Sequence, residues 1–286
     1  MDQYYNLAKQ NYIIMFKERL ENLIAKKNSL LCVGLDSDLR KIPDFLLREE
    51  DPLFIFNREI IQATADFAIA YKPNIAFYES LGAPGWYLLE KTLDLIPSEL
   101  LTIADAKRGD IGHSSQKYAE LFFETYQFDA ITVSPYMGYD SILPFLSYAD
   151  RETFLLCLTS NSGSLDFQYL NVDSEPLYLK IARKAVEWNL QTGNCGLVVG
   201  ATHPEDLGSI REVAPNLPFL IPGIGTQGGN LQMAVQYTYE AGGGGIIINV
   251  SRSILYASSQ KDFAHAARQA AQEIVRQINE LRQLKK

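Results

Sequence analysis

The chain of 286 residues is acidic, with a formal net charge of -8 at pH 7 and a sequence pI near 5.0. This charge argues against a nucleic-acid partner, because proteins that neutralise phosphates usually present a basic face. The N-terminus lacks the basic and apolar segments of a signal peptide, and no apolar run approaches membrane-spanning length. We therefore expect a cytoplasmic protein with no membrane partner.

The sequence has enough apolar content, 47% of its residues, to bury one large core. No low-complexity segment or Pro/Ser-rich linker divides it, so residues 1–286 are predicted to form a single domain. Its cysteines, Cys32, Cys157 and Cys195, are odd in number and lie in or near apolar runs, which predicts packed, reduced thiols. The dispersed histidines and the absence of paired C-x-x-C or H-E-x-x-H patterns indicate no metal site.

The first predicted element is an amphipathic helix over residues 13–25, whose apolar side chains recur at helical spacing. From residue 30 onward, short apolar or β-branched runs alternate with stretches of helical periodicity. Eight runs are predicted as strands, at residues 30–35, 67–72, 101–105, 130–134, 153–159, 196–199, 219–222 and 245–250. Helices are predicted at residues 54–64, 86–95, 115–125, 177–190 and 262–284.

Strands that alternate with helices pair in parallel through right-handed crossovers, and eight such units are the number at which the sheet closes. The sequence therefore predicts an α/β fold, a (β/α)8 TIM barrel with an extra N-terminal helix. We expect that helix to cover the floor of the barrel. In this fold the catalytic groups lie at the C-terminal ends of the strands, so the residues that end each strand are candidates for a site.

The end of the third strand is the most informative of these positions. It carries an Asp-x-Lys-x-x-Asp cluster, formed by Asp105, Lys107 and Asp110. Alternate residues of a strand share a face, so Asp105 and Lys107 should be able to touch. A solvated turn with an incidental ion pair is the common alternative for such a pattern taken alone.

Other strand ends place polar groups at the same mouth of the barrel. Asp36 ends the first strand, Lys72 ends the second, and Thr159, Ser160 and Asn161 end or follow the fifth. Two lysines and three aspartates at one mouth favour a functional site over an incidental cluster.

A glycine-rich turn over residues 223–229 follows the seventh strand, and Ser251 and Arg252 follow the eighth. In this fold the loops after those two strands commonly bind phosphate through backbone N–H groups, and an arginine can add a forked pair of hydrogen bonds. The turn also matches the dinucleotide pattern G-x-G-x-x-G. That pattern belongs after a first strand with an acidic residue ending the next, whereas Glu240 falls in a helical stretch. Glycines that serve only a tight turn are the remaining alternative.

With these residues assembled, the chain from about Leu30 to about Tyr256 resembles the orotidine 5'-phosphate decarboxylase family, in particular its longer bacterial subgroup. The most specific part is residues 105–111, which are similar to the family's D-x-K-x-x-D-I signature. Gly112 and Ser251 depart from the commoner form, which has Pro and Gly there. The resemblance implies conversion of orotidine 5'-monophosphate to UMP and CO2 in de novo pyrimidine biosynthesis, without metal or organic cofactor.

The resemblance also implies roles for individual residues. Catalysis is assigned to a network of Lys72, Asp105, Lys107 and Asp110, with Asp110 supplied by the partner subunit of a homodimer. A fixed ammonium can stabilise a carbanion and then protonate it, which suits Lys107. The implied substrate contacts are Asp36 and Lys72 at the ribose, Ser114 at the neighbouring ribose, Ser160 at the pyrimidine edge, and Gly223, Gly225, Gln227, Ser251 and Arg252 around the phosphate.

Two other functions stay open at this point. A magnesium-dependent decarboxylase of a sugar-keto acid phosphate, from the same group of barrels, shares D-x-K-x-x-D but holds its metal with an acidic residue at the end of the second strand. Lys72 occupies that position here. A non-catalytic sensor of a phosphate ligand would keep Gly225 and Arg252 but would have no need for Lys107 beside two carboxylates.

Overall fold

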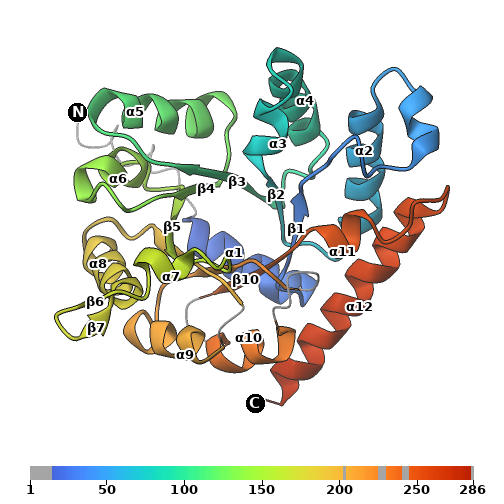
Figure 1. The fold of residues 1–286 in the computed structure, drawn as a ribbon. Helices are drawn as coiled ribbons and strands as arrows, with labels where there is room; N and C mark the ends of the chain where they lie inside the picture. The colour runs from blue at the N-terminus through green and yellow to red at the C-terminus, as the bar shows by residue number, and fades with distance from the viewer. Residues whose placement is uncertain (1–14, 202–203, 225–229, 240–244, 285–286) are drawn as a thin grey trace, which may run out of the picture.

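The computed structural model describes residues 15–201, 204–224, 230–239 and 245–284, and within them eight parallel strands form one closed barrel (Figure 1). Each strand pairs with its neighbours in chain order, and the first closes on the last. The predicted (β/α)8 class is confirmed. The barrel strands are β1 (Leu31–Leu35), β2 (Ala70–Pro73), β3 (Leu101–Arg108), β4 (Ala130–Val133), β5 (Glu152–Leu158), β8 (Cys195–Val199), β9 (Phe219–Ile221) and β10 (Ile246–Val250).

Helices surround these strands on the outside of the barrel (Figure 1). The longer ones are α2 (Pro52–Thr64), α4 (Ala83–Asp94), α5 (Gly112–Glu120), α6 (Tyr139–Leu146), α8 (Leu177–Thr192), α9 (Pro204–Val213), α10 (Leu231–Thr238) and α12 (Phe263–Gln283). Short helical turns are η1 (Asp44–Arg48), α3 (Ile75–Glu79), η2 (Leu121–Thr125), α7 (Ser164–Phe167) and α11 (Arg252–Leu255). Among the described helices, none is both long enough and apolar enough to cross a bilayer.

Local sequence accounts for where several helices begin and end. The side chain of Asp51 accepts a hydrogen bond from the N–H of Phe54 at 3.4 Å, and Pro52 occupies the first turn, so α2 begins there. Gly193 has φ +78 and ends α8, a left-handed conformation that glycine adopts without a steric penalty. The predicted helix 115–125 is divided, because α5 passes into the π-helical turn η2, where Phe122 and Phe123 are both buried.

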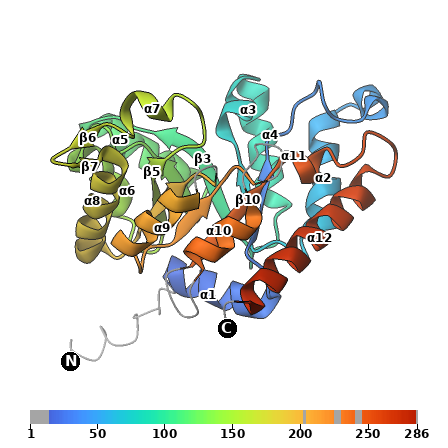
Figure 2. The same cartoon turned by 60° about the horizontal axis from the view of Figure 1, so that its bottom comes forward.

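The extra N-terminal helix is α1 (Phe16–Lys27), and the predicted residues Ile13 and Ile14 lie outside the described part of the chain. Phe16 packs edge-on against Phe154 of β5, with ring centroids 5.9 Å apart. Leu20 lies against Gly245, where an added Cβ would come within 2.8 Å of it. Both contacts are near the N-terminal ends of strands, so α1 covers the barrel floor (Figure 2).

The segment after β5 contains structure that the sequence did not predict. It holds α7 and a two-stranded antiparallel hairpin, β6 (Asn171–Val172) with β7 (Glu175–Pro176). The turn residues Asp173 and Ser174 both have positive φ, as the tight turn of a two-residue hairpin requires. Glycine, the usual signal of such a turn, is missing at both positions.

The three cysteines are free and buried, as predicted. Burial raises the pKa of the Cys32 thiol to about 12, even though Lys72 lies close enough to act against this shift. Burial also raises the pKa of Cys157 and of Cys195. All three thiols are therefore protonated near neutral pH and serve as core side chains, because the thiolate is the reactive form of cysteine.

Candidate active site

A cavity of about 520 Å³ opens at the C-terminal ends of the barrel strands, where the fold places catalytic groups. Strand ends from both halves of the chain line it. Eight of the predicted site residues belong to this lining: Asp36, Lys72, Asp105, Lys107, Ser160, Gly223, Ser251 and Arg252. The closed barrel therefore brings together residues that are more than two hundred positions apart in the sequence, such as Asp36 and Arg252.

The other four predicted site residues fall into two groups. Gly225 and Gln227 fall within residues 225–229, outside the described part of the chain. Asp110 lies between β3 and α5, where its Oδ1 accepts the N–H of Ile111 at 2.8 Å, and Ser114 is exposed in the first turn of α5. One chain alone does not bring Asp110 or Ser114 into its own cavity lining.

Asp105 lies between two lysines at the centre of the cavity. Lys72 Nζ donates to Oδ2 of Asp105 at 2.5 Å, and Lys107 Nζ donates to Oδ1. The predicted contact between Asp105 and Lys107 is confirmed. The side chain of Lys72 is 3% exposed and that of Lys107 is 50% exposed. Lys72 is thus a buried partner of the carboxylate, while Lys107 also reaches open space.

Burial and charge oppose each other in this trio. Burial by itself favours neutral Asp105, but the ammonium groups of Lys72 and Lys107 outweigh it and hold the pKa of Asp105 well below its usual range. Burial likewise favours neutral Lys72, yet Asp105 and Asp36 raise its pKa above the usual value. Near neutral pH the buried pair is therefore charged, a carboxylate bonded to an ammonium.

The backbone at Lys107 explains how this side chain reaches Asp105. Lys107 has φ +49, and β3 is irregular here, since the five residues from Ala104 to Arg108 lie opposite only three of β4, Ile131 to Val133. Oγ1 of Thr132 accepts the N–H groups of residues 106 and 107 at 3.1 and 3.0 Å. The sequence prediction that the strand ends at Asp105 was wrong, because β3 continues through a bulge. Bulges commonly re-aim side chains at functional sites.

The other side of the cavity holds Ser251 and Arg252 after β10. A Cβ added to Gly34 of β1 would lie 1.9 Å from Oγ of Ser251, so glycine leaves the space that the serine occupies. Asn249 Nδ2 donates to the same Oγ at 3.4 Å. Gly223 has φ +93, which a residue with a side chain rarely adopts. Gly34 therefore makes room for Ser251, and a glycine is needed at position 223.

Two polar atoms of the cavity are buried and have no hydrogen-bond partner among the described residues. They are Oδ1 of Asp36 and Oγ of Ser160. An unpaired buried polar atom costs about 1 to 3 kcal/mol, so such atoms in a cavity are candidates to bind a ligand.

Sequence reasoning missed Thr132 of β4, which lines the cavity, and assigned no role to Asn249, which it placed at the end of the eighth strand. Each lies inside an apolar strand and is buried. The signal that could have found them is a single polar residue within an otherwise apolar run, since a buried polar group usually has a specific partner. Thr132 supports the bulge at Lys107, and Asn249 contacts Ser251.

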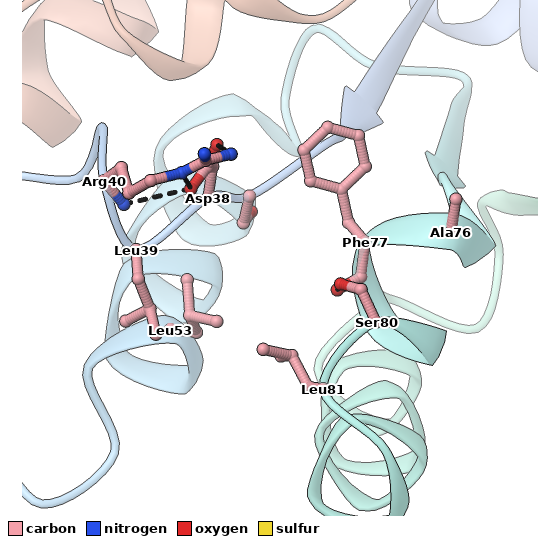
Figure 3. Close-up of a pocket in the computed structure, with 9 residues that line it drawn as sticks. Asp38, Leu39, Arg40, Leu53, Ala76, Phe77, Ser80 and Leu81 are labelled. Atoms are coloured by element: carbon pink, nitrogen blue, oxygen red, sulfur yellow. Dashed lines mark hydrogen bonds and ion pairs between the residues drawn. The ribbon is translucent and has the colours of Figure 1, made fainter.

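A second groove of about 430 Å³ lies between the loop after β1 and α3 (Figure 3). Leu39, Leu53, Phe77 and Leu81 line it, and its rim carries Asp38, which is paired with Arg40. This groove lacks the convergent charges of the first cavity. In the parts of the chain that the structure describes, no three His, Cys, Asp or Glu side chains gather closely enough to hold a metal ion.

Comparison with known proteins identifies the family of this chain. Residues 29–270 match the model of the orotidine 5'-phosphate decarboxylase / HUMPS family. The chain belongs to this family. A relative from Herpetosiphon aurantiacus, named orotidine 5'-phosphate decarboxylase, is 50% identical over 260 residues, which are 90% of this chain and 96% of the relative. A relative of the same name from Phocaeicola vulgatus is 49% identical over 272 residues, which are 93% of this chain and 99% of that relative.

Solved structures of the orotidine 5'-phosphate decarboxylase family share the fold. OMP decarboxylase of Leishmania donovani has a TM-score of 0.80 and 40% identity, and the match covers 92% of this chain and 98% of that one. UMP synthase of the same organism has a TM-score of 0.84 and 42% identity, with 94% of this chain matching 56% of that longer chain. The resemblance inferred from the D-x-K-x-x-D-I residues is confirmed at the level of family and fold.

Proposed function

We propose that residues 1–286 form a single-domain cytoplasmic enzyme that converts orotidine 5'-monophosphate to UMP and CO2. The observation that carries this proposal is the Lys72–Asp105–Lys107 trio, which lies in one cavity with Arg252. Membership of the decarboxylase family and the names of relatives at about half identity support it.

Lys107 is proposed as the proton donor. When CO2 leaves, the broken C–C bond leaves its electron pair on ring carbon C6. An ammonium fixed close by stabilises this negative charge and then gives up a proton to form the new C–H bond. The hydrogen bond from Lys107 Nζ to Asp105 fixes the amine, and half of the side chain faces open space. The neutral amine that remains regains its proton from water.

Asp105 is proposed to destabilise the bound carboxylate of the substrate. Because Lys72 and Lys107 keep Asp105 ionised, it retains its charge when a second carboxylate enters. Two like charges about 4 Å apart repel by about 4 kcal/mol at an effective dielectric constant near 20. The repulsion disappears when the carboxylate leaves as neutral CO2, so it favours the forward step.

The remaining lining residues are proposed to bind the rest of the nucleotide. Arg252 and the backbone near Gly223 and Ser251 would hold the phosphate, together with Gly225 and Gln227 of the same turn. Asp36 and Lys72 would bind the ribose hydroxyls, and Ser160 the pyrimidine edge. The buried, unpaired oxygens of Asp36 and Ser160 support these two assignments, since a ligand would give them partners.

Asp110 and Ser114 are proposed to act in the site of a partner subunit, so that the active unit is a homodimer. Large apolar side chains are exposed in and beside the segment that carries them: Ile111 is 58% exposed, and Met137, whose Cε would lie 3.3 Å from a Cβ added to Gly109, is 42% exposed. Exposed apolar patches commonly mark protein interfaces. Contact between two such surfaces would carry each Asp110 toward the neighbouring cavity.

A turnover assay tests the proposed function. We expect the protein to consume orotidine 5'-monophosphate, which is measured as the loss of the substrate's absorbance. The rate should be the same with and without EDTA. Activity that EDTA abolishes would favour the magnesium-dependent sugar-phosphate decarboxylase. Binding of a phosphate ligand without any turnover would favour the sensor, which has no use for Lys107.

A further inference from the structure

Gln168, directly after α7, is tied by its side chain to the end of β5. The backbone N–H of Thr159 donates to Oε1 of Gln168 at 2.8 Å, and Nε2 of Gln168 donates to Oγ1 of Thr159 at 2.8 Å. A backbone N–H can only donate, so the amide must turn its oxygen toward it, and this fixes the orientation of the amide. Oγ1 of Thr159 in turn donates to Oδ1 of Asn161 at 2.6 Å.

Gln168 is itself held firmly. Its N–H donates to the carbonyl of Ser164 at 2.8 Å, and its carbonyl accepts the N–H of Tyr178 at 3.0 Å. The hydroxyls of Tyr169 and Tyr178 donate to the two oxygens of Asp206 on α9, at 2.5 and 2.8 Å. The segment that carries Gln168 is therefore anchored to both α8 and α9, and Gln168 is a fixed support for Thr159.

Ser160 lies between the two residues that this chain of hydrogen bonds orients. It lines the cavity, and its Oγ is buried without a partner among the described residues. On its other side, a Cβ added to Gly200 would come within 2.3 Å of that Oγ and 2.9 Å of the Ser160 nitrogen. Gly200 thus lets β8 approach closely, and Gln168 sets the backbone that leads into Ser160.

We propose that Gln168 is a positioning residue that aligns Ser160 with the pyrimidine ring and so controls affinity for the base. This inference rests on the proposed function, because it takes the ligand to be a pyrimidine nucleotide. Arg252, proposed at the phosphate, follows β10, which is separated from β5 by β8 and β9 in the barrel. Loss of the Gln168 side chain should therefore weaken binding of the base and leave binding of the ribose phosphate unchanged.

Calorimetric titration of Gln168→Ala with UMP and with ribose 5-phosphate tests this separation. We expect the Kd of UMP to be about tenfold higher for the variant than for the unchanged protein. The Kd of ribose 5-phosphate should agree between the two proteins within about twofold. Gln168→Glu keeps an oxygen facing the Thr159 N–H, so the loss of UMP affinity should be smaller. Gln191→Ala is the matched control, since this exposed side chain only accepts a 3.4 Å bond from Tyr139.

Thermal melting of each variant reports whether the fold is intact. If Gln168→Ala does not fold, Gln168→Glu takes its place, with a weaker but still UMP-specific loss expected. Equal weakening of both ligands, or unchanged UMP affinity in a folded variant, would overturn the positioning role. Failure of the unchanged protein to bind UMP would instead overturn the proposed function, and this inference with it.

Discussion

At the scale of single residues, Lys107 combines two properties that rarely occur together. Its amine is fixed by the carboxylate of Asp105, yet half of its side chain faces the cavity. Lys72 bonds to the same carboxylate but is buried. Both lysines lower the pKa of Asp105, but of the two only Lys107 is exposed enough for the proposed action on a ligand.

Replacing Lys107 with alanine should abolish turnover without unfolding the protein. General acid catalysis and charge stabilisation are both lost, so we expect kcat to fall by about a thousandfold or more. Steady-state kinetics measures the loss, and circular dichroism monitors the fold. Lys117→Ala is the control, because that lysine lies exposed on α5, outside the cavity lining, and forms an ion pair with Glu120 of the same helix. Near-normal turnover in Lys107→Ala would refute the proton-donor role.

Replacing Arg252 with alanine should mainly weaken substrate binding. Charge-assisted hydrogen bonds contribute about 1.5 to 3 kcal/mol, so KM should rise about 10- to 100-fold. The KM of Arg252→Lys should lie between those of the unchanged protein and Arg252→Ala, since an ammonium keeps the charge but loses the forked geometry. An unchanged KM in Arg252→Ala would count against the phosphate contact.

At the scale of elements, Gly34 of β1 leaves the space that the side chain of Ser251, directly after β10, occupies. Gly34→Ala would bring a methyl carbon to 1.9 Å from Oγ of Ser251 and displace the start of α11. We expect KM to rise about tenfold, and the double change Gly34→Ala with Ser251→Gly to restore most of the loss, because the two side chains share one space. Ser251→Gly alone is the control. A double variant as impaired as Gly34→Ala would contradict this fit.

A buried carboxyl at the start of β5 should make stability depend on pH. Glu152 is 2% exposed, and burial raises its pKa well above the ordinary value, with Lys17 offsetting this only in part. The folded protein then holds a proton that the unfolded chain releases, so stability should fall as the pH rises above the ordinary carboxyl range. Chemical denaturation at several pH values should show a smaller fall for Glu152→Gln. If the free energy of unfolding falls equally with pH in both proteins, Glu152 is not the cause of the fall.

The sequence predicted the regular elements well and the irregular ones poorly. All eight barrel strands appear, because runs such as residues 31–35 are apolar on both faces, as a covered parallel sheet requires. The bulge at Lys107 and the turn at residues 173–174 depend on positive φ at residues other than glycine, which no sequence pattern marks. In the candidate site, the strand ends were found from the barrel rule, whereas Thr132 and Gln168 act through hydrogen bonds across the fold.

At the scale of the whole molecule, the proposed homodimer makes each site depend on two chains. Asp110 follows Lys107 by three residues but does not line the cavity of its own chain. If it acts across the interface, a mixed dimer of the Lys107→Ala and Asp110→Ala variants places both changes in the same site. One site would then carry both changes and the other neither.

Mixing the two inactive variants should therefore restore activity. Half of the dimers formed at random are mixed, and each contains one intact site, so about a quarter of the normal activity is expected. The measurement is turnover after the subunits are dissociated and reassociated together. The separate variants, treated in the same way, are the controls. A mixture as inactive as its components would place Asp110 in its own chain's site or outside catalysis.

The irregular stretch of β3 also limits how this chemistry could be transferred to another protein. A regular strand would also place Asp105 and Lys107 on one face, but here the lysine has φ +49 within a bulge of β3. Copying only the letters D-x-K onto a different barrel would leave out this backbone conformation. A transplanted motif would also need Thr132 of the adjacent strand, whose hydroxyl accepts the N–H groups of residues 106 and 107. The smallest part that could be moved to another protein is therefore a pair of strands.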